Sequence, residues 1–386
     1  MDPANTLKAF LLHWDITFRS THMPSLFDPI TVKGITLRNR IVASPMCQYQ
    51  ALDGMLNEWH QAHYAMLARG GVGLVVVEAT AVAPEGRITP GDAGLWSDEH
   101  IPGFAEVVSS IKAAGAVPGI QIGHAGRKAG CTPPWEGGSP LERSDPRAWE
   151  PVGPSAVPYM PDSSYVPREM TRQDILATRQ DFVDAASRAL AAGFEWLELH
   201  FAHGFLGQSF LSRHSNIRND LYGGSLENRA RFILETLTAV REIWPRDLPL
   251  TMRLGVVEFD EGASESFADS LEVLRWAKAA GLDLVDVGLA GTTPNEQVPW
   301  GPDFMVPYAE RVRHETGLPV ATSWMITDPK QADAFVREGR LDLVMFARTL
   351  LANPHWAYHA AQELGVDAPQ SVLPTPYAYW LQNWSA

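Results

Sequence analysis

Short apolar runs rich in β-branched residues alternate with longer amphipathic stretches along the chain from residue 40 onward. Near-continuous apolar runs of this length are typical of parallel strands covered on both faces by helices. Eight runs predict strands at Ile41–Pro45, Leu74–Ala81, Val117–Gly123, Trp196–Phe201, Leu250–Leu254, Leu284–Gly288, Val320–Trp324 and Leu343–Ala347. The stretches between them predict helices, for example over 103–114, 174–192, 227–243, 266–280, 329–338 and 349–363.

Eight strand–helix units in one chain predict a (β/α)₈ barrel of the α/β class, which about 250 residues can build. The longest surplus, residues 125–170, is rich in Pro and Gly, and we interpret it as a loop above the barrel rather than a second domain. A doubly wound sheet is the alternative. That fold would favour a glycine-rich phosphate turn after the first strand, and Ser44-Pro45-Met46-Cys47 is not one.

The first 22 residues differ from the rest of the chain. Phe10-Leu11-Leu12 is too short for the apolar core of a signal peptide. A natural start is indicated at Met23. We therefore expect an extension over 1–22, loosely ordered, and one domain over 23–386.

Composition narrows the classes of partner. The 386 residues carry a formal net charge of −14 without a basic run, so a nucleic-acid partner is not expected. Two cysteines, Cys47 and Cys131, cannot form a disulfide framework and favour a reducing, cytoplasmic location. No apolar stretch approaches the roughly 20 residues of a membrane span, so no membrane partner is expected either.

Polar and aromatic residues gather at the carboxyl ends of the predicted strands, where barrel enzymes place their chemistry. In chain order these residues are Cys47, Tyr49, Ala79, Gln121, His124, His200, His203, Arg253, Trp324 and Arg348.

The histidines of Glu198-Leu199-His200-Phe201-Ala202-His203 carry the most chemical information. Two donors at one strand end can hold a single oxygen that gains negative charge, such as that of a carbonyl, nitro or ester group under reduction. A zinc pair is the competing interpretation, because closely spaced histidines also bind metals. A third interpretation is that both histidines are structural residues whose hydrogen bonds are satisfied within the core.

The strand ends resemble those of the old yellow enzymes, flavin-dependent ene-reductases, over nearly all of the chain from about residue 25. The matching stretches are Leu37–Arg40, Ser44–Tyr49, Glu78–Val82, Gln121–Arg127, His200–Gly204 and Tyr222–Phe232, the last reading Tyr-Gly-Gly-Ser-Leu-Glu-Asn-Arg-Ala-Arg-Phe. Cys47, the short C-terminal end and the many tryptophans look most like the xenobiotic reductase A branch. An iron–sulfur branch would need four clustered cysteines, and the chain has two.

The resemblance implies FMN as cofactor. Arg253 would face the N1/C2 carbonyl edge of the flavin and stabilise its reduced, anionic form. Gln121 would bind the pyrimidine edge, and Arg348 would hold the phosphate. Cys47 would tune the potential through a weak S–H contact. Backbone and apolar contacts to the cofactor would come from Ser44, Pro45, Met46, Ala79, Trp324, Met325 and Ala347.

It also implies hydride transfer from NADPH or NADH, through the flavin, to the β-carbon of an alkene activated by a carbonyl or nitro group. His200 and His203 would hold the activating oxygen, with Tyr49 as a third donor. The zinc interpretation is then less favoured, because the sequence offers no third protein ligand at this strand end.

Two positions depart from the family pattern. Phe205 stands where the family usually has the tyrosine that protonates the α-carbon, so water or another group must donate, with a loss on the order of 10²–10⁴ in rate. Met325 and Ala347 stand where glycine usually lets backbone amides approach the phosphate. Met325 then needs a permitted backbone conformation or a shifted loop, and we expect FMN to bind more weakly.

Trp324 and Trp380 are candidates to line the substrate space, with Phe205 beside it, and the alternative is that both are core or interface residues. In relatives the C-terminal segment reaches a neighbouring subunit, which implies that Trp380 acts in trans in a homodimer or larger oligomer. Two further classes remain open: a flavin-binding protein with weak turnover, and a metal-dependent barrel hydrolase that uses His200 and His203.

Overall fold

Eight parallel strands close into a barrel in the computed structural model, which describes residues 23–161 and 165–384. Around the barrel the strands follow in the order β10-β11-β12-β3-β4-β5-β8-β9. Their bounds are β3 Ile41–Ala43, β4 Leu74–Ala81, β5 Val117–Gly123, β8 Trp196–Phe201, β9 Leu250–Val257, β10 Leu284–Leu289, β11 Val320–Thr322 and β12 Leu343–Phe346. The predicted (β/α)₈ barrel is confirmed.

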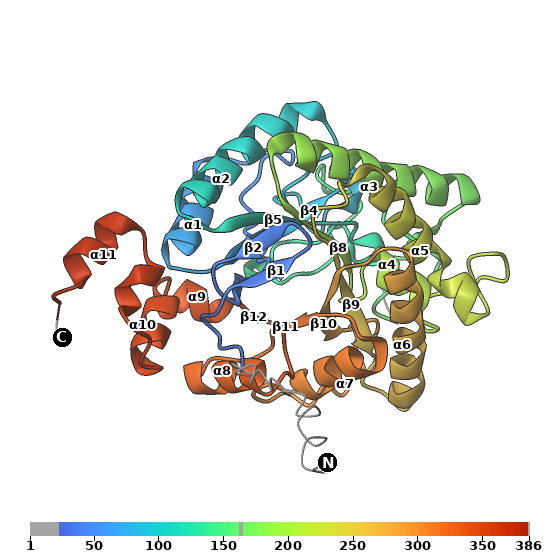
Figure 1. Ribbon diagram of the computed structural model, residues 1–386. Coiled ribbons are helices and arrows are strands. Elements are labelled where there is room, and N and C mark those ends of the chain that lie inside the picture. The colour runs from blue at the N-terminus through green and yellow to red at the C-terminus, as the bar shows by residue number, and fades with distance from the viewer. Residues whose placement is uncertain (1–22, 162–164, 385–386) are drawn as a thin grey trace, which may run out of the picture.

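Helices surround the barrel and bury its outer face (Figure 1). The apolar side of each helix packs on the β-branched outer residues of the strands, which forms the larger of two apolar cores. The long helices are α1 Glu58–Arg69, α2 Ile101–Ala113, α3 Arg172–Ala192, α5 Leu226–Ile243, α6 Ala263–Ala279, α7 Val306–Thr316 and α8 Pro329–Arg337, and a short α4, Leu206–Leu211, follows β8.

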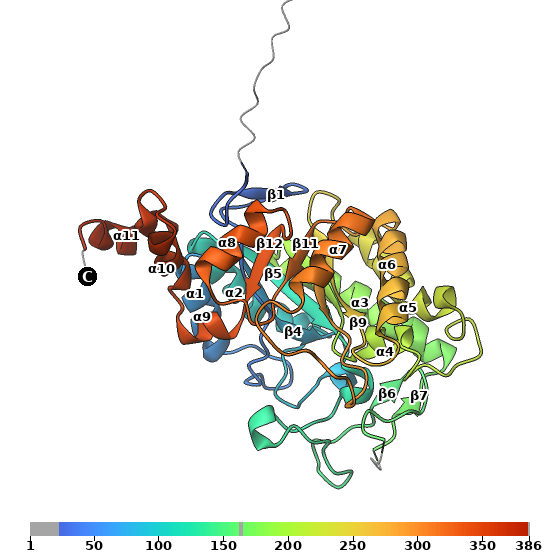
Figure 2. The same ribbon diagram turned by 90° about the horizontal axis from the view of Figure 1, so that it is seen from below.

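The inside of the barrel changes from apolar to polar along its axis. At the amino ends of the strands, Trp196, Leu284 and Leu343 belong to a second apolar cluster. A hairpin of β1 (Ile30–Val32) and β2 (Ile35–Leu37) packs against this cluster and covers that end (Figures 1 and 2). Two residues after Trp196 and Leu284, on β8 and β10, the buried side chains are Glu198 and Asp286. Chemistry is therefore confined to the carboxyl end.

The described residues of the predicted loop, 125–161 and 165–170, lie at the carboxyl end, opposite the hairpin (Figure 2). They form short elements: η3 Gly126–Lys128, η4 Pro134–Glu136, and a two-stranded sheet of β6 (Val152–Gly153) and β7 (Arg168–Glu169). The sheet packs beside η3 and α4. The segment thus covers the barrel's upper end, as its Pro and Gly content predicted.

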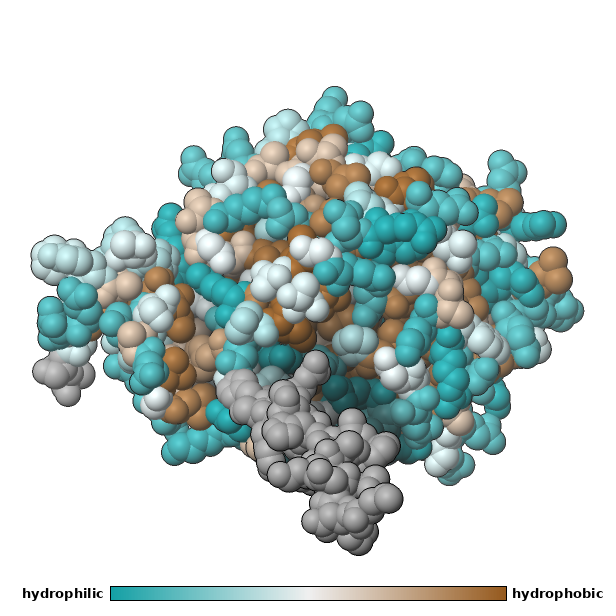
Figure 3. Space-filling view, viewed as in Figure 1, coloured by the Kyte–Doolittle hydropathy of each residue, from teal (hydrophilic) through white to brown (hydrophobic). Residues whose placement is uncertain are grey.

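The last elements form an arm, residues 356–384, that projects from the barrel (Figures 1 and 2). It comprises α10 Trp356–Glu363, η5 Pro369–Val372 and α11 Thr375–Leu381. Tyr379, Trp380 and Trp384 are 60%, 78% and 64% exposed on it. Figure 3 draws this arm mostly in pale tints and the surrounding face mainly in hydrophilic colours.

The predicted helix over 349–363 is wrong as a single element. The structure has α9 (Arg348–Ala352), then a break, then α10. Pro354 lies in the break, where it disfavours the helical conformation of Asn353 before it. The strands predicted to end at Pro45, Trp324 and Ala347 end one or two residues earlier, because the chain turns there into loops. The extension over 1–22 lies outside the described residues, and no described helix is long and apolar enough to cross a membrane.

We expect Phe232→Ala to lower the free energy of unfolding by about 3–5 kcal/mol, the usual cost of truncating a buried phenylalanine. The Phe232 ring is 1% exposed and stacks on Phe210 with centroids 4.7 Å apart, so the vacated space cannot be refilled by small shifts. Urea unfolding followed by circular dichroism measures the change. Ile217→Ala, at a side chain 71% exposed, serves as control. Equal losses in both variants would contradict this account of the core.

Candidate active site

A cavity of about 830 Å³ opens at the carboxyl ends of β3, β9, β11 and β12. Parallel strands in a closed barrel all end at one rim, so segments far apart in the sequence meet there. Seven of the predicted cofactor-binding residues line this cavity: Ser44, Pro45, Arg253, Trp324, Met325, Ala347 and Arg348.

The loop after β11 has an unusual backbone. Trp324 and Met325 have φ values of 74° and 61°, in the left-handed region. This conformation costs a residue with a Cβ about 1–2 kcal/mol, and glycine avoids the cost. Met325 therefore adopts the glycine-like conformation that the sequence required of it, and its side chain is 41% exposed.

Arg253 carries the charge at the floor of the cavity. Its Nε lies 3.0 Å from Oδ2 of Asp286, and its Nη2 donates to Oγ of Ser323 at 3.1 Å. Glu198, a strand away, accepts from Nε2 of Gln121 at 2.7 Å. Burial raises the pKa of both Glu198 and Asp286, while Arg253 opposes the rise. One guanidinium between two buried carboxyl groups thus supplies a fixed cation.

His200 and His203 lie beside this cavity. Their rings meet edge to face with centroids 5.0 Å apart, and His203 contacts the Trp324 ring at 5.7 Å. The N–H of Ala202 donates to Nδ1 of His200 at 3.4 Å, which leaves Nε2 of His200 to carry a hydrogen. Nε2 of His203 is buried and has no hydrogen-bond partner among the described residues.

Both imidazoles are neutral. Burial lowers the pKa of each well below 6.5, and the charges of Arg253 and Lys128 lower it further. A buried, unpaired nitrogen costs free energy unless a ligand completes its hydrogen bonding. The pair is therefore suited to binding an oxygen atom through neutral N–H groups, and it is not a satisfied core pair.

Phe205 separates the histidines from a second cavity of about 390 Å³. Its ring centroid lies 5.0 Å from that of His200 and 6.2 Å from that of His203. Tyr49, Lys128 and Tyr159 also line this second cavity. The histidine pair thus lies between two cavities. The larger contains Arg253 and Arg348, and the smaller contains Arg127, Lys128 and four aromatic side chains.

The remaining predicted residues lie apart from the large cavity. Burial and the charges of Asp92 and Glu78 raise the pKa of the Cys47 thiol, so it stays protonated. The pKa of Tyr49 is likewise raised by burial. Ala79 lines a small space with His200 and Phe205, and Met46 packs against the apolar core. Trp380, on α11, lines none of the cavities described here.

Three residues at the site, Glu198, Asp286 and Lys128, were not predicted from the sequence. Glu198 precedes His200 by two residues and so shares its face of β8, and Asp286 interrupts an apolar run between Val285 and Val287. These signals were present in the sequence. The position of Lys128 beside Phe205 depends on how the loop after β5 folds.

The residues of the large cavity fit FMN. Its volume lies within the roughly 300–1,000 Å³ of small-molecule sites. Arg253 and Arg348 offer cations suited to a flavin carbonyl edge and a phosphate. The buried Nε1 of Trp324 has no hydrogen-bond partner within residues 23–161 and 165–384, so it is a donor that a polar ligand would satisfy.

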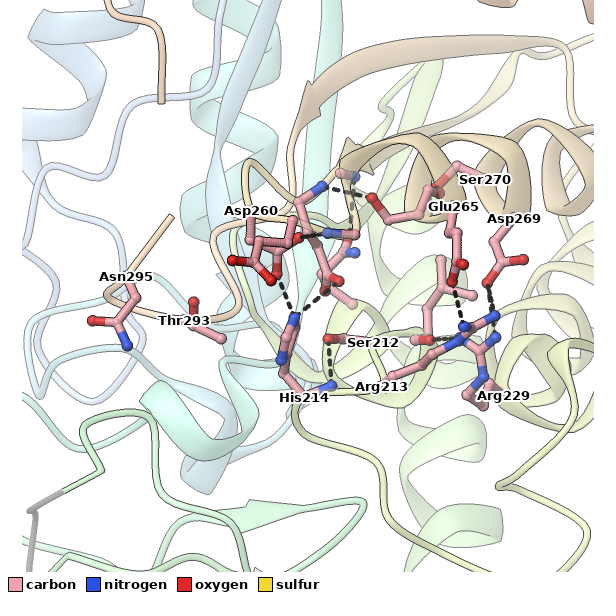
Figure 4. A pocket seen from close by; sticks show the side chains of 17 residues that line it. Ser212, Arg213, His214, Arg229, Asp260, Glu265, Asp269, Ser270, Thr293 and Asn295 are labelled. Atoms are coloured by element: carbon pink, nitrogen blue, oxygen red, sulfur yellow. Dashed lines mark hydrogen bonds and ion pairs between the residues drawn. The ribbon is translucent and has the colours of Figure 1, made fainter. Parts of the chain in front are cut away.

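A third cavity, of about 450 Å³, contains the group of side chains best placed for a metal, His214, Glu258 and Asp260 (Figure 4). Its charges already pair with one another: His214 Nε2 lies 2.6 Å from Asp260 Oδ2, and Arg213 Nη1 lies 2.8 Å from Glu265 Oε2. Over the described residues no acidic or cysteine side chain joins His200 and His203 in such a group. The hydrolase interpretation therefore lacks a third ligand there.

Comparison with known proteins agrees with this geometry. The sequence pattern of the family described as NADH:flavin oxidoreductase / NADH oxidase matches residues 25–367. An NADPH dehydrogenase of Geobacillus thermodenitrificans is 44% identical over 348 residues, which cover 89% of this chain and 96% of that protein. An NADPH dehydrogenase of Bacillus subtilis is 41% identical, over 90% of this chain and 97% of that protein.

Solved structures give the same result. Morphinone reductase in complex with tetrahydroNAD superposes with a TM-score of 0.72 at 27% identity, over 89% of this chain and 92% of that one. A 2-naphthoyl-CoA reductase superposes with a TM-score of 0.78 at 28% identity, over 90% of this chain and 53% of the larger chain.

We expect Met325→Gly to tighten FMN binding about tenfold, equivalent to about 1.4 kcal/mol. Glycine adopts the left-handed φ of 61° without cost and lets the backbone amide approach a phosphate. Quenching of flavin fluorescence measures the dissociation constant. Met325→Ala keeps Cβ while removing the rest of the side chain, and should tighten binding less. Identical constants for all three proteins would show that this backbone position does not limit the affinity.

Proposed function

The chain belongs to the NADH:flavin oxidoreductase / NADH oxidase family, and from this premise we propose that it is an ene-reductase acting on alkenes conjugated to a carbonyl or nitro group. It is an NAD(P)H:FMN oxidoreductase of the old yellow enzyme type. The proposal adds the substrate class and the residues that act on it.

What FMN supplies when bound is two-electron chemistry, with hydride passing from the nicotinamide coenzyme to an acceptor. Arg253 and Arg348 would hold the cofactor, with Ser44, Pro45 and Ala347 as the apolar and backbone contacts. Asp286 and Ser323 fix the guanidinium of Arg253 in position, so the cation does not have to reorganise during the reaction.

The observation that carries the proposal is the pair of neutral imidazoles between the two cavities. An oxygen atom bound by Nε2 of both His200 and His203 would lie in a buried, weakly polar space, where two N–H groups stabilise developing negative charge strongly. Withdrawal of electrons toward that oxygen makes the β-carbon of a conjugated alkene electrophilic. Neutral donors suit this role because they bind a neutral carbonyl or nitro group without first losing a counterion.

A flavin-binding protein with weak turnover is the second candidate, and Phe205 favours it. The ring packs against both histidines and has no proton to give. Oxidation of NADPH with and without 2-cyclohexenone separates the two, since only a reductase couples loss of coenzyme to loss of the alkene.

The C-terminal arm supports a homo-oligomer. Trp380 is 78% exposed and Tyr379 is 60% exposed on α11, and neither lines either of the two cavities. Exposed aromatic side chains on a projecting helix are costly in water unless a partner covers them. We therefore propose that Trp380 reaches the substrate space of a second copy of this chain.

Replacing His200 or His203 by alanine should lower kcat/KM for 2-cyclohexenone about 10²-fold each, the usual effect of removing one donor to a developing oxyanion. Anaerobic stopped-flow absorbance with FMN-loaded protein separates the alkene step from coenzyme oxidation. His314→Ala, at an exposed position on α7, is the matched control. Histidine variants that reduce the alkene at the parental rate would refute the role of the pair.

Trp380→Ala should shift the protein toward the monomer and raise KM for the alkene several-fold, because the arm would lose its main apolar contact. Analytical ultracentrifugation and steady-state kinetics measure the two effects. Trp59→Ala, at a side chain 55% exposed on α1, serves as comparison. A parent protein that is monomeric at working concentration would exclude action in trans.

A further inference from the structure

Lys128 is a lysine at the carboxyl end of the barrel that has no part in the proposed cofactor binding. It ends η3 after β5, and its Nζ donates to the backbone oxygens of His203 and Gly291, each at 2.7 Å. An ammonium group has three N–H bonds. The third N–H bond has no acceptor among the described residues, and the side chain lines the cavity of about 390 Å³ next to Phe205.

The amine is held beside the oxygen-binding pair. Because Nζ binds the carbonyl of His203, any movement of that loop carries both groups together. Nζ also lies 4.0 Å from the centroid of the Tyr159 ring and 6.0 Å from that of Phe205. An acceptor held by His200 and His203 and extending past Phe205 would therefore meet this amine.

Reduction of the alkene requires one acid in this cavity. After hydride reaches the β-carbon, the α-carbon must gain a proton, and Phe205 cannot give it. Tyr49 and Tyr159 have hydroxyl protons, but burial raises the pKa of both, which makes them weaker acids. Burial and the charge of Arg127 together lower the pKa of Lys128 to about 7, although Glu296 opposes the shift. An acid with a pKa near the working pH is the more effective donor.

We propose that the Lys128 ammonium protonates the α-carbon of the bound alkene and so replaces the missing phenol at position 205. This assignment rests on the proposed ene-reductase function. In the step, the C=C π bond breaks, hydride that originates from NADPH forms the β C–H bond, and the lysine proton forms the α C–H bond. The alkene is reduced by two electrons, NADPH is oxidised, and water returns a proton to the neutral amine.

Lys128 is the group in this cavity whose charge is expected to change near neutral pH, because its neighbours keep theirs. Arg127 donates to the backbone oxygens of Thr292, Val157 and Pro158 and stays cationic, with a pKa of about 10. Glu296 accepts from the N–H of Thr292 and of Gly291 and is the nearby anion. The other titratable neighbours are protonated or neutral there: Cys131, whose pKa is raised to about 11, Tyr159, His200 and His203.

The sign of the pH dependence follows. The ammonium fraction is nearly complete below pH 6 and falls as the pH rises through about 7. Alkene reduction should therefore slow by about tenfold per pH unit above 7, and by about 10²-fold at pH 9. The buried histidines stay neutral over this range and contribute no opposing change.

The test measures oxidation of the reduced holoenzyme by 2-methyl-2-cyclohexenone and by 1,4-benzoquinone in stopped flow. The quinone is protonated on oxygen, so the alkene-to-quinone rate ratio isolates carbon protonation. Lys128→Met should lower this ratio by about 10²-fold and abolish its decline above pH 7. In D₂O, Lys128→Met should also place deuterium on both faces of the α-carbon, whereas the parent protein should place it on one face.

Lys128→Arg keeps a cation but holds its proton more tightly, so its ratio should fall as well. In the Lys128→Met protein, Phe205→Tyr should restore the ratio, because a phenol then stands where the family has one. Lys330→Met, at an exposed lysine of α8, is the matched control. Visible absorbance of bound FMN shows that each variant is folded.

The proposal would be overturned if Lys128→Met kept the alkene-to-quinone rate ratio, the pH profile and the deuterium preference of the parent protein. If the parent and Lys330→Met oxidise NADPH and reduce the quinone but never the alkene, the ene-reductase function itself fails, and this proposal fails with it. The proposal is supported if the parent protein reduces the alkene and the alkene-to-quinone rate ratio falls in Lys128→Met.

Discussion

Closure of the barrel is the constraint on which the rest of the structure depends. Hydrogen bonding of β10 to β9 and of β12 to β3 leaves the barrel sheet without an edge, and it brings eight carboxyl ends to one rim. His200, Arg253 and Asp286 are register partners on three adjacent strands. Their side chains meet at one level of the barrel because of this register, although 86 residues of chain length separate the first from the last. The hairpin at the opposite end leaves this rim as the place for polar chemistry.

Burial at the rim decides the charge state of each group. One guanidinium lies against carboxyl groups whose pKa is raised, and the same low-polarity surroundings keep both imidazoles uncharged. Lys128 is subject to the same effect, since desolvation of its ammonium and the field of Arg127 both favour loss of its proton. A fixed guanidinium, two neutral imidazoles and a weakly basic amine can thus coexist in one small volume. Each follows from how much water the fold excludes.

Much of the fold could be predicted from the chain. The strands at Leu74–Ala81, Val117–Gly123 and Trp196–Phe201 have the predicted bounds, since an uninterrupted apolar run can satisfy its burial only inside a sheet. The segment over 349–363 could not be predicted as well, because its apolar periodicity continues across the break at Pro354. Seven predicted cofactor contacts share one cavity, whereas Gln121 donates to Glu198 and Trp380 is exposed on the arm. Those two depend on neighbours that no local pattern specifies.

The sequence by itself determined the barrel, the family, and the residues at the strand ends, because period and motif are local properties of the chain. Only the tertiary structure decided which of those residues share a cavity and whether their groups are charged. It also decided that Met325 adopts a left-handed conformation and that Lys128 lies beside Phe205. These properties depend on distance and on exclusion of water, and both are set by segments that meet only after the barrel has closed.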